Sequence, residues 1–530
     1  MKSKSVLIVG AGPTGLTLAV ILKKYGIPFR LIEKKEGLSR YTKATNVMQR
    51  NQEVLYALGL IEPLAAISGF MKRMMVTAYG KNFGPRTMRL RESPFQDVIL
   101  CGQHNFESVV ASGLKALGGE IEFKTELMSL TQSSNEVTAE IKKDGTVTQA
   151  SFDLVVGCDG HAGVSRKFTK NDFKIEKTGV TLRQVDCKLK WKRLTTGEQM
   201  WLFYFDKGFS VIVPLPGGIH RVITVEPNDR VPQREPTLDE MQTKLREVAC
   251  DESVTLTEPE WFSFTDLSMG IAPSLIDGRI IFAGDVGNPI LPNGGQGMNT
   301  GISDAFNLGW KIATFFGKGK HSEILATYNE ERHALRANLQ KAQFNSLKYT
   351  TLVTPHWMQR LFRTLAEPLL DWGGEYKMAQ AFSELAINTR KSRLTLDDKS
   401  SKRGVRAGDR ALDADIVYEG KARNIYEFIY RGSWTLLLFT GRYEGRSVQL
   451  PKFDIGDLPT FIVSTRSDVK PEASTFYDLD EVAHRAYGVQ NGAIYLIRPD
   501  GHVGLKTDLD NAKALKNYLS KWVCAELAYH

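Results

Sequence analysis

Short apolar runs that end in glycine alternate with amphipathic stretches at the start of the chain. Val6 to Val9 is a continuous apolar run closed by Gly10, which is typical of a strand buried in a parallel sheet. Leu16 to Lys24 has the periodicity of a helix, Gly26 follows it, and Phe29 to Ile32 forms a second apolar run. The pattern predicts a β-α-β unit at the N-terminus.

The alternation continues to about residue 174, where the pattern changes. Residues 53–58 and 106–117 have helical periodicity, and residues 121–132 and 152–160 read as strands. Residues 197–226 are aromatic, β-branched and interrupted by glycine and proline, which predicts an antiparallel sheet with hairpins. A further buried strand follows at about 279–283 and an amphipathic helix at 302–316. The pattern is then mostly helical over 323–390, polar as in a linker over 390–410, and that of an α/β unit over about 405–530.

Composition and charge narrow the class of protein. A hydrophobic content of 42% and a charged content of 24% are those of a globular chain. The net charge of +9 is spread along the sequence, so it indicates a solvated surface and no nucleic-acid partner. Lys2 and Lys4 precede an apolar run, as in a signal peptide, but Gly10, Gly12 and Pro13 interrupt that run. We expect a cytoplasmic protein without an integral membrane segment.

The cysteines do not indicate a metal site or a disulfide framework. There are five of them, none in a C-x-x-C pair and none near histidines at zinc-ligand spacing. We therefore expect free thiols in a reducing compartment. The positions are Cys101, Cys158, Cys187, Cys250 and Cys524.

A glycine-rich turn joins the first predicted strand to the first predicted helix. Gly10 allows a tight turn, Gly12 lets a pyrophosphate approach the backbone, and Gly15 lets the helix pack against the strand. The helix N-terminus favours an anion at this position. Glu33 ends the second strand, where its carboxylate can accept hydrogen bonds from an adenosine ribose. The arrangement predicts a dinucleotide site.

A second glycine-rich turn indicates which dinucleotide binds. Asp285 ends the strand near residue 280 and can bind sugar or ribityl hydroxyls. Gly294, Gly295 and Gly297 precede a helix that starts near Asn299. Free N–H groups at that helix N-terminus would stabilise negative charge on a flavin ring, whereas a nicotinamide has no comparable anionic edge. The alternative is a glycine-rich surface loop.

The chain resembles the group A FAD-dependent aromatic hydroxylases, which are flavoprotein monooxygenases. Three motifs of that family occur in order: the Gly10–Gly15 turn with Glu33, Asp159-Gly160 with Arg166, and Gly284-Asp285. The segment GGQGMNTGISDAFNLGWK is especially similar. The segments ELAINTRKSRL and GVRAGDRALDADI resemble the branch of phenol hydroxylases, polyketide hydroxylases and rifampicin monooxygenases, which carry a thioredoxin-like C-terminal domain.

The resemblance implies an α/β fold with a Rossmann-like FAD-binding domain, an inserted antiparallel-sheet substrate domain, a helical segment and a thioredoxin-like C-terminal α/β domain. The FAD-binding domain is expected in two parts, and the first carries a short substrate-side excursion near residues 76–98. The expected boundaries are 1–174, 175–272 for the substrate domain, 273–345, 346–400 for the helical segment and linker, and 401–530 for the C-terminal domain.

The resemblance also implies which residues hold a non-covalent FAD. Glu33 would bind the AMP ribose, Asp285 the ribityl chain, residues 295–299 the flavin pyrimidine edge, and Pro292 would lie at the oxygen-reacting side of the flavin. Three positions depart from the family pattern: Lys43, Gly163 and Asn288 stand where arginine, serine and histidine are usual. The expected cofactor-binding set is Gly10, Ala11, Gly12, Pro13, Thr14, Gly15, Glu33, Lys34, Lys43, Arg50, Gln103, Leu127, Asp159, Asp285, Pro292, Gly295, Gln296, Gly297, Met298 and Asn299.

The aromatic strands give two interpretations of the substrate side. Alternation along a strand puts Trp201, Phe203 and Phe205 on one face and Tyr204 on the other. In one interpretation the Phe203 face roofs an apolar pocket over the flavin, with His220 as a further substrate contact. In the other, the aromatics only pack the sheet, and the pocket lies around Asn46, Met48 and residues 76–98.

The resemblance implies that NADPH or NADH reduces the flavin and that O2 then forms a C4a-hydroperoxyflavin. This species would hydroxylate a phenolic or polycyclic aromatic substrate, a class that includes polyketides and antibiotics. Baeyer–Villiger insertion, epoxidation, or a FAD-dependent reductase without oxygen insertion are the alternatives. The C-terminal domain lacks C-x-x-C, so we expect it to be structural or oligomer-forming, in a monomer or homodimer.

Overall fold

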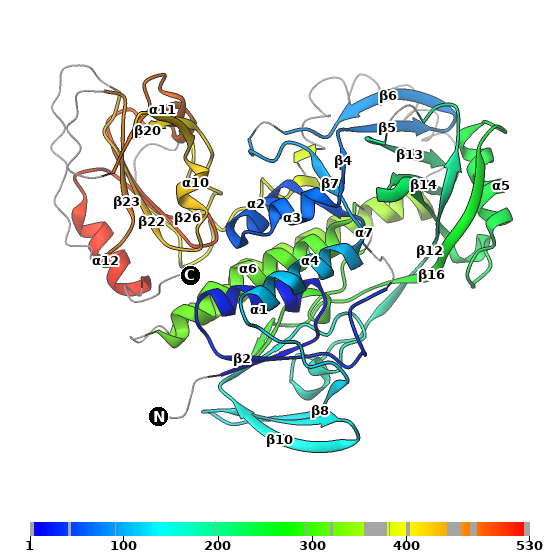
Figure 1. Ribbon diagram of the computed structural model, residues 1–530, viewed down its shortest axis with the longest axis horizontal. Coiled ribbons are helices and arrows are strands. Elements are labelled where there is room, and N and C mark those ends of the chain that lie inside the picture. Colours follow the sequence, from blue (N-terminus) through cyan, green and yellow to red (C-terminus); the bar gives the residue numbers. More distant parts are fainter. Residues whose placement is uncertain are drawn as a thin grey trace.

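The computed structural model describes residues 5–40, 44–90, 92–194, 197–291, 294–317, 322–353, 379–380, 382–398, 403–442, 457–466 and 474–523 (Figure 1). Three residues of the sequence predictions, Lys43, Pro292 and Cys524, lie outside this description. Their expected roles stay predictions.

A mostly parallel five-stranded sheet carries the N-terminal motifs. Its strand order is β17-β18-β11-β1-β2, and the four strands from β18 to β2 run parallel. Every residue of β1 and β11 is buried, as their continuous apolar runs require. The strands are β1 (Val6–Val9), β2 (Phe29–Ile32), β11 (Leu154–Gly157), β17 (Ile276–Asp277) and β18 (Ile280–Phe282). The predicted β-α-β unit is confirmed.

Four helices of this unit come from distant parts of the sequence, and α1 packs against both α4 and α6 (Figure 1). Helix α1 begins at Pro13, three residues before the predicted start, because proline suits the first helical position. The helices are α1 (Pro13–Lys24), α4 (Gln103–Ala116), α6 (Gln296–Phe316) and α7 (Ala326–Leu347), which the short helix η6 (Lys348–Val353) continues.

Two small sheets flank the five-stranded sheet. One is antiparallel, with the order β10-β9-β8, and the other has the order β3-β7-β4 next to α2 and α3. Their strands are β8 (Thr125–Gln132), β9 (Val137–Lys143), β10 (Thr146–Phe152), β3 (Asn46–Val47), β4 (Gly69–Met71) and β7 (Val98–Leu100). The helices are α2 (Gln49–Leu58) and α3 (Ile61–Ala66).

A seven-stranded sheet holds the aromatic strands, in the order β16-β12-β15-β14-β13-β5-β6. Its last two strands come from residues 73–87, and β5 runs parallel to β13, so the expectation of a purely antiparallel sheet is corrected at this edge. Helix α5 (Leu238–Ala249) lies on its outer side (Figure 1). The strands are β5 (Arg73–Ala78), β6 (Lys81–Thr87), β12 (Glu176–Lys190), β13 (Gln199–Phe205), β14 (Gly208–Pro214), β15 (Ile219–Pro227) and β16 (Thr255–Met269).

The C-terminal unit is built on an eight-stranded sheet of order β19-β26-β25-β22-β23-β24-β20-β21. Strand β19 belongs to the segment that the sequence pattern assigns to a linker, but it pairs with β26 and so is part of this unit. The elements are β19 (Leu396–Asp397), β20 (Asp415–Tyr418), β21 (Lys421–Asn424), β22 (Thr435–Phe439), β23 (Thr460–Ser464), β24 (Thr475–Tyr477), β25 (Ala493–Ile497), β26 (Val503–Thr507), α10 (Tyr426–Ile429), α11 (Val482–Tyr487) and α12 (Ala512–Trp522).

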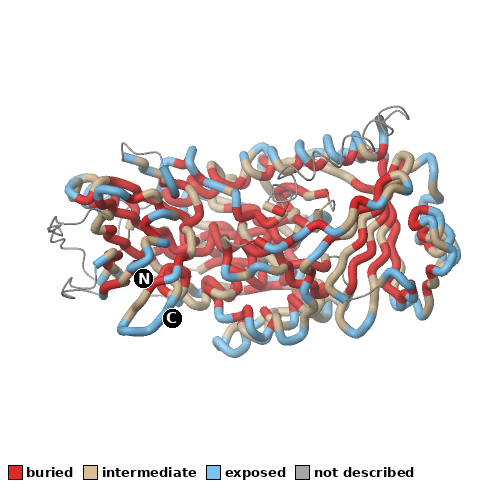
Figure 2. Tube along the Cα trace, turned by 90° about the horizontal axis from the view of Figure 1, so that it is seen from above, coloured by how far each residue is buried: buried red, intermediate tan, exposed pale blue. Residues whose placement is uncertain are grey.

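The N-terminal and C-terminal units share one hydrophobic core. A single buried cluster includes residues of β1, α6 and β22, and buried segments follow one another through the middle of the molecule in Figure 2. Trp310 of α6 packs edge-on against Trp434, with 5.6 Å between the ring centroids. The C-terminal unit is therefore docked firmly on α6. No helix in the described part of the chain is long and apolar enough to cross a membrane.

Candidate functional site

Three sequence motifs that lie far apart in the chain meet at the N-terminal turn of α1. Gly10 has a φ of +101°, and a Cβ there would lie 2.6 Å from the carbonyl oxygen of Cys158, next to the Asp159 motif. Gly284 has a φ of +77°, and a Cβ there would lie 2.7 Å from Thr14 Oγ1. Only glycine combines this backbone conformation with such close approach. The structure thus explains the glycines at both positions.

Gly12 and Gly297 face open space. A Cβ added at either glycine would meet no protein atom within 4 Å, whereas one added at Gly15 would lie 1.9 Å from the Gly10 carbonyl oxygen. Gly12 precedes α1 and Gly297 lies in the first turn of α6, and neither helix has a side-chain cap. Each N-terminus therefore has backbone N–H groups and room for an anionic group. These features fit the pyrophosphate and the flavin edge of FAD.

Glu33 is held against the first glycine turn. One carboxylate oxygen accepts a hydrogen bond from the Ala11 backbone N–H at 2.9 Å, and the other accepts from the Lys35 N–H at 3.0 Å. The side chain is half-buried, and Lys34 beside it is exposed. The carboxylate is thus fixed next to the turn with part of its surface accessible, as a ribose-binding group requires.

Asp159 organises the second motif through Ser165. Its carboxylate accepts hydrogen bonds from the Ser165 N–H at 2.9 Å and from Ser165 Oγ at 2.7 Å. Burial raises the pKa of Asp159, and these hydrogen bonds oppose the shift. A Cβ added at Gly163, one of the positions that depart from the family pattern, would lie 2.4 Å from an Asp159 carboxylate oxygen, so a larger residue there would have to displace this side chain.

Asn299 ties the first turn of α6 to the segment before α2. The side chain is fully buried, and its oxygen accepts from the Met48 N–H at 2.8 Å. Its amide nitrogen donates to the carbonyls of Asn46 at 3.0 Å and Gly295 at 2.9 Å. Asp285, which precedes α6 in the sequence, lies in the short helical turn η4 (Gly284–Val286) and is half-buried. Asn299 thus links Gly295, at the start of the predicted flavin-side segment, to Asn46 and Met48.

Three other predicted cofactor residues have structural partners of their own. Gln103 begins α4 and donates to Glu107 at 2.7 Å, while Leu127 is buried at the irregular pairing of β8 with β9. Arg50 is buried and donates to Glu53 at 2.8 Å, to the Tyr430 hydroxyl and to the Asp500 carbonyl at 2.6 Å. Arg50 thus contacts the C-terminal unit, and its expected place along the cofactor stays a prediction.

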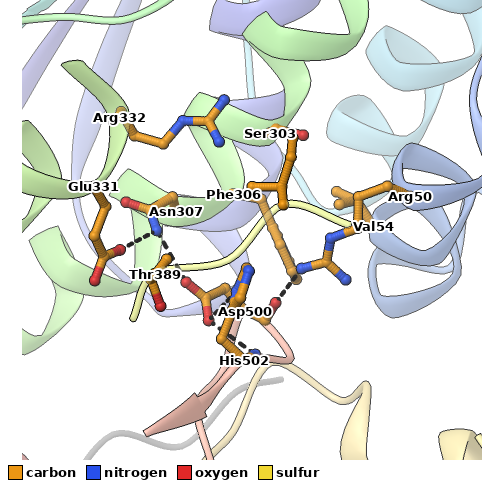
Figure 3. A pocket seen from close by; sticks show the side chains of 11 residues that line it. Arg50, Val54, Ser303, Phe306, Asn307, Glu331, Arg332, Thr389, Asp500 and His502 are labelled. Carbon is orange, nitrogen blue, oxygen red and sulfur yellow. Dashed lines mark hydrogen bonds and ion pairs between the residues drawn. The ribbon is translucent and has the colours of Figure 1, made fainter. Parts of the chain in front are cut away.

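A buried polar cluster joins α6 and α7 to the C-terminal unit around Asp500 (Figure 3). Arg498 bonds both oxygens of Glu331 at 2.8 and 2.9 Å and also pairs with Asp500. Lys311 donates to Glu331 at 2.8 Å; burial lowers the pKa of this lysine to about 8, against the opposing effect of Glu331. The adjacent cavity, about 20 Å³, holds roughly one water molecule. It is too small for a dinucleotide or a substrate.

The seven-stranded sheet turns the predicted substrate aromatics away from the glycine-rich turns. Phe203 is 1% exposed and packs with Trp201 and Trp191 in a cluster that α5 completes, and Phe205 packs against the same cluster. His220 pairs with Cys187 of this cluster, so it belongs to the same face. This packing favours the alternative interpretation for the two phenylalanines, and the expectation that Phe203, Phe205 and His220 contact substrate stays a prediction.

The opposite face of the sheet is turned toward Met48 and Phe382. Tyr204 and Leu202 on this face pack against a cluster that includes Met48, and Phe382 packs there as well. Phe209 lies directly across from Tyr204 on β14, with 6.2 Å between the ring centroids. This inner face includes the surroundings of Asn46, Met48 and residues 76–98, which were the alternative location for the pocket.

Two polar residues at this site were missed by the sequence reasoning. Asn51 lies in α2 and hydrogen-bonds Asn299 at 3.1 Å, and Glu384 hydrogen-bonds Asn51 at 3.3 Å and Ser303 at 3.1 Å. The sequence gives one local signal for Glu384, because a carboxylate between the apolar residues Phe382 and Leu385 indicates a buried polar group. This signal does not indicate which residues hydrogen-bond the carboxylate. In the described part of the chain, no group of acidic, histidine and cysteine side chains could hold a metal ion.

Comparisons with known proteins agree with this geometry. Residues 3–342 match the FAD binding domain family, and residues 446–527 match the phenol hydroxylase C-terminal dimerisation domain. An uncharacterized aromatic compound monooxygenase of Bacillus subtilis is 27% identical, with 98% of each chain covered. The 6-methylpretetramide 4-monooxygenase of Streptomyces rimosus is 26% identical over 94% of this chain and 90% of the relative.

The fold is also found among solved structures. The flavin-dependent monooxygenase PieE, solved in complex with FAD and substrate, superposes with a TM-score of 0.79 over 98% of this chain and 99% of that chain, at 19% identity. This likeness shows the shared mixed α/β architecture of several sheets with a C-terminal α/β domain.

Proposed function

Because the chain belongs to the FAD binding domain family and is a FAD-dependent monooxygenase of the aromatic hydroxylase type, we propose that it hydroxylates a neutral phenolic or polycyclic aromatic with O2 and NADPH or NADH. The observation that carries the proposal is the open space at Gly12 and Gly297, beside two uncapped helix N-termini. When bound, FAD supplies the redox chemistry of NAD(P)H oxidation and O2 activation.

The residues of the chain bind and orient this cofactor. We assign the pyrophosphate to the backbone N–H groups at Gly12, the AMP ribose to Glu33, and the flavin pyrimidine edge to the first turn of α6. Asp285 would contact the ribityl hydroxyls. These contacts are all non-covalent, so acid or heat should release free FAD from a yellow protein.

The inner face of the seven-stranded sheet is the proposed substrate wall. It is apolar around Tyr204, Leu202 and Phe209, which suits an aromatic ring and excludes water from the reacting flavin. Its buried Arg221 is neutralised by Asp186 through two hydrogen bonds of 2.7 Å. A substrate carboxylate would therefore find no uncompensated cation in Arg221, which is why we propose a neutral substrate.

The C-terminal unit is the proposed dimerisation element. Strands β23, β22, β25 and β26 lie side by side in this order, with β22 parallel to β23 and β25 antiparallel to β26, which is the arrangement of a thioredoxin-like core. The match to a dimerisation domain supports a homodimer. Sedimentation of the purified holoprotein would test this: a mass of one chain at micromolar concentration would refute it.

A substrate screen tests the activity. The holoenzyme is mixed with NADPH or NADH and with matched pairs of neutral phenols and aromatic carboxylates, and NAD(P)H consumption, H2O2 and product mass are followed. We expect neutral aromatics to stimulate oxidation and to gain one hydroxyl oxygen. An ester or epoxide product would point to the alternative oxygen insertions, and NAD(P)H oxidation without oxygen transfer would point to a reductase.

A further inference from the structure

Glu384 is a buried carboxyl group that joins the segment 382–385 to α6 and α2. The residue is 4% exposed. Its two oxygens accept hydrogen bonds from Ser303 Oγ at 3.1 Å, Asn51 Nδ2 at 3.3 Å and Thr300 Oγ1 at 3.4 Å. Two helices from distant parts of the chain, α2 and α6, thus converge on this one side chain.

The backbone of Glu384 is held in an unfavourable conformation. Its φ is +61°, in the left-handed region that disfavours any residue with a Cβ. Burying a carboxylate among neutral partners carries a further cost. A glycine at this position would remove both costs. Strain of this kind persists where the surrounding structure or a function requires the side chain.

Asn51 connects Glu384 to the predicted flavin edge. The same Asn51 amide nitrogen that donates to Glu384 donates to Asn299 Oδ1 at 3.1 Å. Asn299 in turn fixes Gly295 and Met48, as described above. Phe382 lies against the same turn, because a Cβ added at Gly294 would approach its ring within 2.7 Å. One hydrogen-bonded residue therefore separates Glu384 from Asn299.

The charge of Glu384 is not neutralised within its hydrogen bonds, since its three partners are neutral. Burial raises the pKa of this carboxyl group, and Arg332 of α7 acts in the opposite direction. Arg332 itself donates a hydrogen bond to Asp304 at 2.6 Å, so the positive charge of Arg332 is shared between Asp304 and Glu384. A carboxylate with neutral partners in a low-dielectric interior keeps a long-range effect on nearby charges.

We propose that Glu384 is a positioning residue for the flavin: through Asn51 it fixes Asn299 and the first turn of α6, and its negative charge makes reduction of the bound FAD less favourable. The inference rests on the proposed function, because the redox effect exists only if FAD binds beside this turn. Added electrons on the flavin would be repelled by the carboxylate, so its removal should ease reduction.

The test compares Glu384→Gln, Glu384→Gly and the wild-type chain. FAD affinity is measured by titrating apoprotein and following flavin fluorescence, and the midpoint potential of the bound FAD is measured by dye equilibration. We expect Glu384→Gln to shift the potential to a more positive value, and Glu384→Gly to do the same while binding FAD about three- to tenfold more weakly. The glycine variant keeps the backbone conformation and should fold even if the glutamine variant does not.

Glu252→Gln is the matched control, because it makes the same charge change at a side chain that is 88% exposed and lies after α5. It should leave both readouts at the wild-type value. Wild-type potential and affinity in both Glu384 variants would overturn the inference. Failure of the wild-type chain to bind FAD would instead refute the proposed function, so the two failures are distinguishable.

Discussion

Arg50 in α2 donates a hydrogen bond across 2.6 Å to the main-chain carbonyl of Asp500, which lies 450 positions later in the chain. The Asp500 side chain in turn accepts from Asn307 and Trp310 of α6, both at 3.1 Å. The C-terminal unit is thereby bonded to the two helices whose first turns meet at Asn299. The helices that hold the C-terminal unit in place are therefore the same helices that form the predicted flavin site.

Gly12→Val should abolish tight FAD binding while leaving the fold intact. The added side chain meets no protein atom near its Cβ, and Gly12 has an ordinary φ of −76°, so it would occupy only the space assigned to the pyrophosphate. FAD titration and thermal unfolding of the apoprotein measure the two effects. Gly37→Val, whose Cβ also meets open space, is the control. Normal FAD affinity in Gly12→Val would show that the pyrophosphate binds elsewhere.

Glu33→Ala should weaken FAD binding by about ten- to a hundredfold, because a hydrogen bond that involves a charged group contributes roughly 1.5–3 kcal/mol. Part of the loss in affinity arises because the Ala11 N–H would no longer donate a hydrogen bond to the Glu33 carboxylate. Turnover at saturating FAD should change little. Glu36→Ala, an exposed neighbour, serves as the control. A loss of turnover with unchanged FAD affinity would contradict this role.

Tyr204→Ala should uncouple the reaction, whereas Phe205→Ala should not. The two side chains are adjacent in β13 but belong to opposite faces of the sheet, and only Tyr204 faces the Met48 side. Truncation there would admit water or misplace the substrate, so H2O2 would rise at the expense of product. The measured quantity is the ratio of product formed to NADPH consumed. Equal ratios in both variants would place the substrate away from this face.

Arg498→Met should lower the free energy of unfolding by about 3–5 kcal/mol, because it leaves the buried Glu331 and Asp500 carboxylates incompletely paired. Arg390→Met removes an ion pair with Asp409 at the surface and should cost less than about 1 kcal/mol. Denaturant unfolding followed by circular dichroism compares them. Similar losses in both variants would mean that the buried cluster contributes no more than a surface pair.

Asp413→Asn should change how stability depends on pH. Burial, the largest effect, raises the pKa of Asp413 to about 6, although the N–H groups of Tyr426 and Ala414 act against it. The folded chain therefore binds this proton more tightly than the unfolded chain, whose carboxyl titrates near 3.9. The resulting stabilisation is complete below pH 3.9 and is lost as the pH rises through 6.

Wild-type protein should accordingly lose roughly 2 kcal/mol of stability relative to Asp413→Asn between pH 4 and pH 7. Unfolding in denaturant at several pH values measures the difference. A difference that stays constant across this range would show that Asp413 titrates normally in the folded protein.

The sequence by itself determined the local units of this protein. Strand β1, helix α1 and strand β2 follow from apolar runs and glycine positions within one short segment, because buried strands and helix starts depend on neighbouring residues. The three glycine-rich and acidic motifs were likewise readable, since each needs only its own turn. Even the alternation of Phe203 and Tyr204 across the two faces of a strand was predicted correctly.

Only the tertiary structure decided which face of that strand meets α5 and which meets Met48. Periodicity separates two faces but does not say what covers either one, because the covering elements come from residues 48 and 238–249, far away in the sequence. The same reason explains the strand from the expected linker, which pairs with β26, and the convergence of Asn51, Asn299 and Glu384. Contacts between distant residues depend on how whole elements pack, and no local pattern records that packing.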